Sequence, residues 1–434
     1  MSASERGSRI LIYSHDTFGL GHLRRCRAIA HALVGEYRHL SVLILTGSPI
    51  IGSFDFRARV DFVRVPGVIK LRSGNYTSLS LHIDIEDTVR IRESIIKYTA
   101  DVFDPDIFIV DKEPLGLRGE IEDTLHMLKA RGTRLVLGLR DVLDEPELLR
   151  PEWERKEAMP ALESIFDEIW IYGHKDIYHP LDGLDPSENV RQKTVFTGYL
   201  PRALPEPEPL EHWPEIANEP FLLVTTGGGG DGEGLIDWVL STYETQEDLP
   251  YPALLVLGPF MSAEHQVEFQ ARASKLDNVE VIIFHTRIEQ LMARAEAVVA
   301  MGGYNTFCEA LTLDKPTLIV PRMVPRKEQY LRAEKASRLN LIRMLIDPQE
   351  AGIGLRDPEK MAVELRALAT QKKPSEAGYG AELLSGFDVV CEQVRPWLLR
   401  EDRKTGETGE AADTSEKAAS ENSGDGDQSA LGAL

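Results

Sequence analysis

A histidine that follows two glycines is the first candidate for chemistry in this sequence. After an apolar run at residues 10–13 the chain reads SHDTFGLGH, which ends at His22, where a helical pattern begins. Glycines such as Gly19 and Gly21 let the backbone approach a ligand, and a helix start offers N–H groups without partners. An imidazole in that setting can act as a base near neutral pH, so we predict a catalytic role for His22. A plain turn between a strand and a helix is the alternative, and His15 is expected to be structural.

Four consecutive glycines form the second candidate site. Gly227, Gly228, Gly229 and Gly230 follow the pattern of a buried strand at residues 221–225 and precede a helical pattern. The backbone N–H groups of such a loop can hold the oxygens of a phosphate. No Gly-Lys-Ser or Gly-Lys-Thr follows, so the loop differs from the lysine-bearing P-loop of nucleoside triphosphatases. A flexible hinge turn is the alternative interpretation.

Charged residues follow two further apolar runs in the first half of the chain. Asp111-Lys112-Glu113 comes after residues 107–110, and Arg140-Asp141 comes after residues 135–139. Ligands of open parallel sheets bind outside the carboxyl ends of the strands, so these side chains are expected to point into one cleft. Asp111 and Arg140 could orient an acceptor there, or the charges could form surface ion pairs.

The acidic and cysteine residues lack the spacing of a metal site. Asp104 and Asp106 resemble a metal-binding Asp-x-Asp, but they precede their strand and would lie at its amino end. Cys26, Cys308 and Cys391 lie far apart, without the spacing of metal ligands or of a disulfide framework. We therefore expect no metal and no cofactor, and a reducing cytoplasm fits the cysteines best.

The most specific pattern begins at Met301 and reads MGGYNTFCEAL. Asp314-Lys315-Pro316, Pro321-Arg322 and Glu328-Gln329-Tyr330 follow it. In order and spacing this resembles the MurG-like glycosyltransferases of the GT-B fold, which join two Rossmann-type domains across a cleft and hold the donor mainly in the C-terminal one. The resemblance covers about residues 9–370 and is strongest in the second half. The loop that ends at His22 also looks like the glycine-histidine loop of that family and of related nucleotide-sugar hydrolases.

The resemblance implies roles for the matching positions. Glu309 would accept hydrogen bonds from the ribose hydroxyls of the donor, although Thr306 and Glu309 also have the spacing of a capping box. Gln329, and less surely Glu328, would contact hydroxyls of the donor sugar, while the four glycines would receive the diphosphate. The residues expected to bind the donor are Gly227, Gly228, Gly229, Gly230, Gly302, Gly303, Asn305, Thr306, Glu309, Glu328 and Gln329.

One departure from the family bears on the acceptor. The peptidoglycan enzyme has more glycines and a Thr-Gly-Gly-His run after its first strand, whereas here His22 is followed by Arg24 and Arg25. The acceptor is therefore not expected to be a lipid-linked peptidoglycan precursor. The two arginines could hold an anionic acceptor or form a solvated helix face, and we favour the solvated face. Residues Ile69 to Leu81 are predicted to form a mobile acceptor loop.

The elements that must position these residues are repeated β-α units. Short β-branched runs alternate with longer helical patterns in two series, which is typical of parallel sheets. The predicted strands are residues 10–13, 42–45, 62–65, 107–110, 135–139, 169–171 and 195–197, then 221–225, 253–257, 279–283, 297–300, 317–320 and 341–345. We expect an α/β protein of the GT-B fold, with two Rossmann-like domains whose parallel sheets face a central cleft.

The domain boundaries follow from the segments between and after the two series. Five prolines between residues 201 and 214 interrupt any regular element and indicate a linker. We predict a Rossmann-like acceptor domain at residues 1–200, a linker at 201–220 and a nucleotide-sugar donor domain at 221–375. A helical segment at residues 376–400 and a disordered acidic tail at 401–434 complete the chain.

Length and charge limit the class of protein. At 434 residues the chain exceeds what one core usually organises, and its net charge of -21 argues against nucleic acid as a partner. Its apolar runs are too short to span a membrane, and its polar start lacks a signal-peptide core, so we predict a cytoplasmic protein with peripheral membrane contact at most. The expected partners are a nucleotide-sugar donor, a UDP-sugar in our interpretation, and an acceptor that the sequence does not identify.

Three functions remain open from the sequence. The first is an inverting, metal-independent glycosyltransferase in which His22 activates the acceptor hydroxyl and the glycine loop stabilises the departing diphosphate. The second is a nucleotide-sugar hydrolase, in which water takes the place of the acceptor. The third is a non-catalytic nucleotide-sugar-binding protein with an intact donor site and an unused His22.

Overall fold

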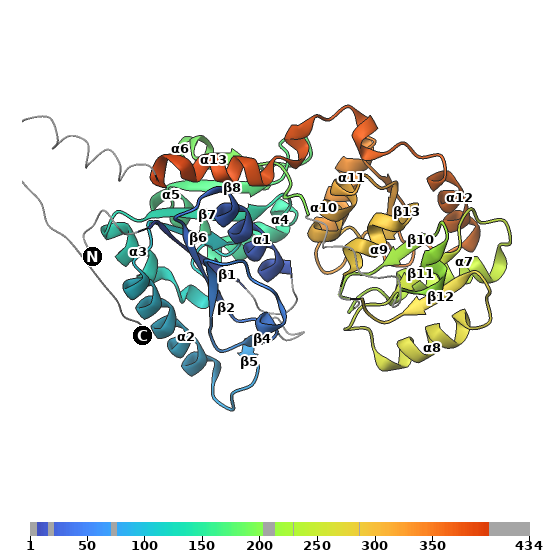
Figure 1. Ribbon diagram of the computed structural model, residues 1–434, viewed down its shortest axis with the longest axis horizontal. Helices are drawn as coiled ribbons and strands as arrows, with labels where there is room; N and C mark the ends of the chain where they lie inside the picture. The colour runs from blue at the N-terminus through green and yellow to red at the C-terminus, as the bar shows by residue number, and fades with distance from the viewer. Residues whose placement is uncertain are drawn as a thin grey trace, which may run out of the picture.

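The protein consists of two α/β domains that lie side by side (Figure 1). The computed structural model describes residues 7–15, 21–70, 76–202, 213–228, 230–285 and 287–398. The predicted tail at 401–434 lies outside the described residues. The predicted GT-B arrangement of two domains with parallel sheets is confirmed.

The first domain is built on a seven-stranded parallel sheet in the order β3-β2-β1-β6-β7-β8-β9. Its strands are β1 (Arg9–Ser14), β2 (Ser41–Thr46), β3 (Val60–Arg64), β6 (Ile107–Asp111), β7 (Arg134–Arg140), β8 (Glu168–Tyr172) and β9 (Thr194–Phe196). Its helices are α1 (Gly21–Glu36), α2 (Ile85–Phe103), α3 (Glu122–Ala130), α4 (Pro146–Arg155), α5 (Ala158–Ser164) and α6 (Glu188–Gln192). Helices cover both faces of the sheet, so a central strand such as β6 is buried along its whole length and reads as a continuous apolar run.

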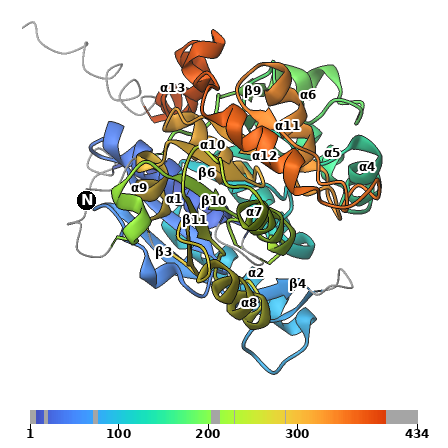
Figure 2. The same ribbon diagram turned by 90° about the vertical axis from the view of Figure 1, so that its right-hand side faces the viewer.

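The second domain has a six-stranded parallel sheet in the order β12-β11-β10-β13-β14-β15. Its strands are β10 (Leu222–Thr225), β11 (Ala253–Val256), β12 (Val279–Ile282), β13 (Ala297–Ala300), β14 (Thr317–Ile319) and β15 (Arg343–Met344). Its helices are α7 (Glu233–Thr245), α8 (Ala263–Ala273), α9 (Ile288–Arg294), α10 (Tyr304–Thr312), α11 (Glu328–Arg338) and α12 (Pro358–Leu368). Helices α7, α8 and α12 lie on the side away from the first domain, which faces the viewer in Figure 2.

In both sheets the order in which successive strands are added changes direction next to the first strand of the domain. Every predicted strand is present, and the order changes direction between β1 and β6 and again between β10 and β13. Such switch points open a crevice at the carboxyl ends of the strands. The loop before His22 leaves β1, and the four-glycine loop leaves β10, so each begins at a switch point.

The predicted acceptor loop at Ile69 to Leu81 is in part a hairpin. Strands β4 (Val68–Lys70) and β5 (Tyr76–Ser78) pair in antiparallel register, with Val68 opposite Ser78. No strand was predicted at these residues, whose β-branched and aromatic side chains favour an extended backbone. The mobile acceptor loop stays a prediction. The residues between the two strands, 71–75, lie outside the described part of the chain.

The chain crosses between the domains twice. After α12 it returns to the first domain, where helix α13 (Gly386–Leu398) packs against α1 (Figure 1). Tyr37 Oη donates a hydrogen bond to the carbonyl of Cys391 at 2.7 Å there. The two crossings are bonded to each other, since Tyr199 N donates to Leu383 O at 2.8 Å and Ser385 Oγ donates to Thr197 O at 2.9 Å.

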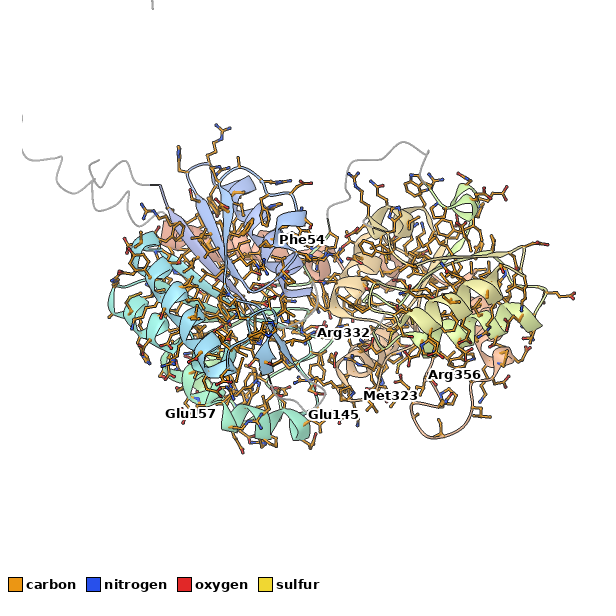
Figure 3. The ribbon with its side chains drawn as sticks, turned by 90° about the horizontal axis from the view of Figure 1, so that it is seen from below. Phe54, Glu145, Glu157, Met323, Arg332 and Arg356 are labelled. Carbon is orange, nitrogen blue, oxygen red and sulfur yellow. The ribbon has the colours of Figure 1, made fainter. Side chains whose placement is uncertain are left out.

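A buried ion pair joins the two domains. Arg332 of α11 lies between them (Figure 3), and its Nε and Nη2 each donate to a carboxylate oxygen of Asp141 at 2.7 Å. Arg332 Nη1 donates to Gly302 O at 2.8 Å, and Tyr199 Oη donates to Asp141 Oδ2 at 2.9 Å. Both charged side chains are fully buried, so these hydrogen bonds must compensate for the loss of hydration.

We predict that replacing Asp141 with alanine lowers the free energy of unfolding by about 3–5 kcal/mol, because it leaves the buried Arg332 charge unpaired. Replacing both residues with leucine should restore part of that loss. Urea denaturation of the full chain measures the effect. Asp123→Ala, which removes an exposed partner of Lys97, is the control and should change stability little. Equal losses in Asp141→Ala and Asp123→Ala would show that the buried pair does not hold the domains.

Candidate functional site

A cavity of about 560 Å³ lies between the domains at the carboxyl ends of both sheets. This volume is typical of small-molecule sites. The predicted residues that line it are Gly21, His22, Arg140, Gly227, Gly228, Gly230, Gly302, Gly303, Asn305, Thr306, Glu309 and Gln329. Asp111 and Glu328 do not line it, and Gly19 and Gly229 lie outside the described residues.

His22 and Asp111 form a hydrogen-bonded pair on the first-domain side. His22 is the second residue of α1, and Asp111 ends β6, the strand beside β1, so the topology brings them together. His22 Nδ1 lies 2.5 Å from Asp111 Oδ2. An ionised carboxylate can only accept, so Nδ1 carries the proton and Nε2 keeps a lone pair.

Arg25 holds Asp111 in its charged form. Its Nε and Nη2 donate to Asp111 Oδ1 at 2.8 and 2.6 Å. Although burial raises the pKa of Asp111, Arg25 and His22 together hold that pKa well below its usual value. Burial lowers the pKa of His22 to about 4, against the opposing effect of Asp111. The pair at neutral pH is therefore a neutral imidazole on a charged carboxylate.

The predicted solvated face at Arg24 and Arg25 is wrong. Arg25 is buried against Asp111, and Arg24 reaches across the cleft to Glu309, with 2.9 Å between Nη2 and Oε1. Arg24 also contacts Glu289 of the second domain. The other alternative that we considered for Asp111 and Asp141, surface ion pairs, is wrong as well, because both carboxylates are buried in their ion pairs.

The capping-box alternative for Glu309 is also wrong. Helix α10 begins at Tyr304, and its N-cap Gly303 provides no side-chain hydrogen bond. Thr306 and Glu309 therefore lie inside the helix, too late to cap its start. Burial raises the pKa of Glu309, and Arg24 opposes that effect. The carboxylate is thus a buried acceptor at the wall of the cavity.

Three glycines are required by the shape of the second-domain wall. Gly302 has a φ of +78°, and a Cβ there would lie 2.7 Å from Ile319 Cγ2. Gly227 and Gly258 also have positive φ, and a Cβ at Gly258 would lie 2.6 Å from the backbone carbon of Gly228. Only glycine allows the loop after β11 to approach the four-glycine turn so closely.

The remaining predicted donor residues are held by arginines. Asn305 Oδ1 accepts from Arg202, and Gln329 Oε1 accepts from the backbone N–H of Arg322 at 3.0 Å. Glu328 Oε1 pairs with Arg322 Nη2 at 2.7 Å. Glu328 thus supports Arg322, which lines the cavity itself.

Several residues that line the cavity were not predicted from the sequence. Arg322 was part of the matched pattern but was given no role. Phe260 follows β11, while Phe284 and His285 follow β12, and these side chains also line the cavity. Inspection of every strand end, which identified Asp111 and Arg140, would have found these aromatic residues too.

Within the described ranges, no three histidine, cysteine or acidic side chains gather in an arrangement that could hold a metal ion. In the same residues, no helix is both long and apolar enough to cross a membrane.

Sequence comparison identifies one known domain in this chain. Residues 222–377 match the model of the glycosyltransferase family 28 C-terminal domain. No curated protein matches the chain by sequence. The match covers the second domain, including the four-glycine turn, Glu309 and Gln329, and it confirms the resemblance drawn from the pattern after Met301.

Solved structures share the arrangement of both domains. The glycosyltransferase VinC in complex with DTDP superposes with a TM-score of 0.57 at 18% identity, covering 91% of this chain and 100% of that one. A UDP-glucosyltransferase from Polygonum tinctorium gives 0.59 at 13% identity, with coverage of 90% and 98%. MurG of Acinetobacter baumannii gives 0.51 at 12% identity, with coverage of 89% and 99%. At these identities the likeness establishes the GT-B fold.

The His22 environment predicts a pH dependence of stability. Its pKa is about 4 in the folded protein and 6.5 ordinarily, so the unfolded chain binds a proton more readily between these values. As pH falls from 6.5 to 4, this residue should remove up to about 3 kcal/mol of unfolding free energy.

Denaturant titrations of the parent and His22→Gln at several pH values measure this loss. The variant should lose less stability than the parent over that range, while His126→Gln, at an exposed position, should follow the parent. Identical slopes for the parent and His22→Gln would contradict the lowered pKa.

Proposed function

We propose that this chain, a glycosyltransferase of the GT-B fold with a family 28 C-terminal domain, transfers a sugar from a UDP-sugar to an acceptor bound by the first domain. The transfer inverts the anomeric configuration and needs no metal. The observation that supports this most is the placement of His22 and Glu309 on opposite walls of one cavity. The family 28 match of the second domain supports a nucleotide-sugar donor.

In this proposal the second domain binds the donor. Glu309 accepts hydrogen bonds from the ribose hydroxyls, a role that requires Arg24 to share or leave its carboxylate. The diphosphate lies beside Gly228 and Gly230 and at the start of α10, because the N–H groups of a helix start attract anions. Phe284 offers an exposed ring at the cavity wall on which the base can stack.

His22 is the proposed base. Its Nε2 removes the proton of the acceptor hydroxyl while that oxygen attacks the anomeric carbon and the bond from this carbon to the diphosphate breaks. Asp111 stabilises the imidazolium that forms, and the N–H groups around the diphosphate stabilise the charge of the leaving group. A single displacement of this kind inverts the anomeric centre.

A bound donor would make His22 a stronger base. Burial favours the neutral imidazole, which is the form able to accept a proton, but it also lowers the pKa and so the strength of the base. A diphosphate brought into the same cavity adds negative charge, which raises the pKa of a nearby imidazole. The donor would thus strengthen the base at the moment when it is needed.

We expect Glu309→Gln to weaken UDP binding about 10- to 100-fold, because it replaces charge-assisted hydrogen bonds with neutral ones. Isothermal titration calorimetry with UDP measures the change. Glu359→Gln, on an exposed helix start, is the matched control and should bind UDP like the parent. If Glu309→Gln bound UDP as tightly as the parent, the carboxylate would pair with Arg24 without contacting the donor.

We expect His22→Gln to lower turnover by about 100-fold or more while UDP affinity stays within a few-fold of the parent, as for loss of a general base. UDP release from a panel of UDP-sugars, with and without acceptors, measures turnover, and product analysis separates transfer from hydrolysis. His126→Gln is the control.

Two results would contradict this assignment. Activity within a few-fold of the parent would show that His22 is not the base. A parallel loss of UDP affinity would show that His22 contacts the donor instead.

A further inference from the structure

Arg140 differs from every other arginine of the cleft. Arg24, Arg25, Arg322 and Arg332 each form an ion pair, with Glu309, Asp111, Asp231 and Asp141 respectively. Over the described ranges, no hydrogen bond or ion pair of the Arg140 side chain is found, and its Nε is buried without an acceptor. Arg140 nevertheless lines the cavity, at the end of β7.

The charge of Arg140 is opposed by a nearby carboxylate, Glu328, but forms no ion pair with it. Burial lowers its pKa, Arg25 and Arg332 lower it further, and Glu328 and Asp141 oppose them without contact. The guanidinium stays protonated even so. Arg140 is half-buried, and its buried Nε lacks an acceptor that an anionic ligand in the cavity would supply.

A second cation supports Arg140 from the neighbouring strand. Lys112 follows Asp111 at the end of β6 and has a φ of +72°, a strained conformation for a residue other than glycine. Burial lowers the pKa of Lys112, and the positive charge of Arg140 adds to this effect. Asp111 lies opposite Gly138 in the register of β6 and β7, so Lys112 and Arg140 follow the ends of adjacent strands.

The local charge balance is positive. Lys112 and Lys156 share Glu113, while Lys156 and Arg326 share Glu152. Together with Arg140 and the nearby Glu328, these are four cations against three carboxylates, in a protein whose net charge is -21. The excess of positive charge beside Arg140 favours an anionic ligand.

We propose that Arg140, supported by Lys112, binds a carboxylate or phosphate group of the acceptor, so that this glycosyltransferase acts on a negatively charged acceptor. This inference rests on the proposed function. β7 is two strands from β1, about 10 Å away, so an acceptor anchored at Arg140 can present a hydroxyl to His22. The diphosphate of the donor is assigned to the glycine turn across the cavity, which leaves Arg140 for the acceptor.

The test uses three small probes on the full chain saturated with UDP. Methyl glucuronide carries a carboxylate, glucose 1-phosphate carries a phosphate, and methyl glucoside is the neutral counterpart. Calorimetry should find at least one anionic probe bound about 10-fold or more tightly than the glucoside, with a difference that shrinks as salt rises. The two anionic probes distinguish a carboxylate acceptor from a phosphate acceptor.

Variants then test whether Arg140 causes the preference for the anionic probe over the neutral one. Arg140→Gln should abolish the preference for the anionic probe, and Arg140→Lys should keep part of it. Arg134→Gln, at the opposite end of the same strand, is the matched control and should keep all of it. UDP affinity should stay within about 2-fold in all three variants.

Two outcomes would overturn the inference. Equal binding of charged and neutral probes by the parent, or none by either, would show that there is no anion site. A loss of UDP affinity in Arg140→Gln would assign the arginine to the donor diphosphate. Failure of the parent to bind UDP would instead contradict the proposed donor, and the probes, titrated without UDP, would still decide the role of Arg140.

Discussion

The arrangement of the site depends on the buried pair of Asp141 and Arg332. Asp141 follows Arg140 at the end of β7, and Arg332 also holds the carbonyl of Gly302 in the donor-side loop. One guanidinium therefore sets the separation between a strand end of the first domain and the glycine loop of the second. Since neither charge can be hydrated, the pair tolerates little change in geometry, and the walls of the cavity inherit that constraint.

Pairing of buried charges also accounts for the electrostatics of the cleft. Arg25 pairs with Asp111, which orients His22, while burial keeps the pKa of His22 low. Arg24 and Glu309 pair across the cleft. The other cleft arginines are thus each paired with a carboxylate, and Arg140 is the exception in the part of the chain that the structure describes.

The fold followed from the sequence because its signals are local. Each buried strand is a continuous apolar run. Because ligands of parallel sheets bind at the carboxyl ends of the strands, the sequence alone predicted that His22, Asp111 and Arg140 lie at one edge. The partners of the charged residues are not local. Arg24 finds Glu309 285 residues away, and Asp141 finds Arg332 191 residues away. No pattern in the sequence distinguishes such buried pairs from a solvated helix face. The spacing of Thr306 and Glu309 suggested a helix cap, which does not form because α10 already begins at Tyr304.

The double crossing between the domains limits how the cleft can open. The segments at residues 197–199 and 383–385 are hydrogen-bonded to each other, so two paired segments connect the domains rather than one. Two segments that are hydrogen-bonded to each other can bend together but resist twisting. We therefore expect the domains to open and close by bending about this connection, which would return the two walls of the cavity to the same relative position.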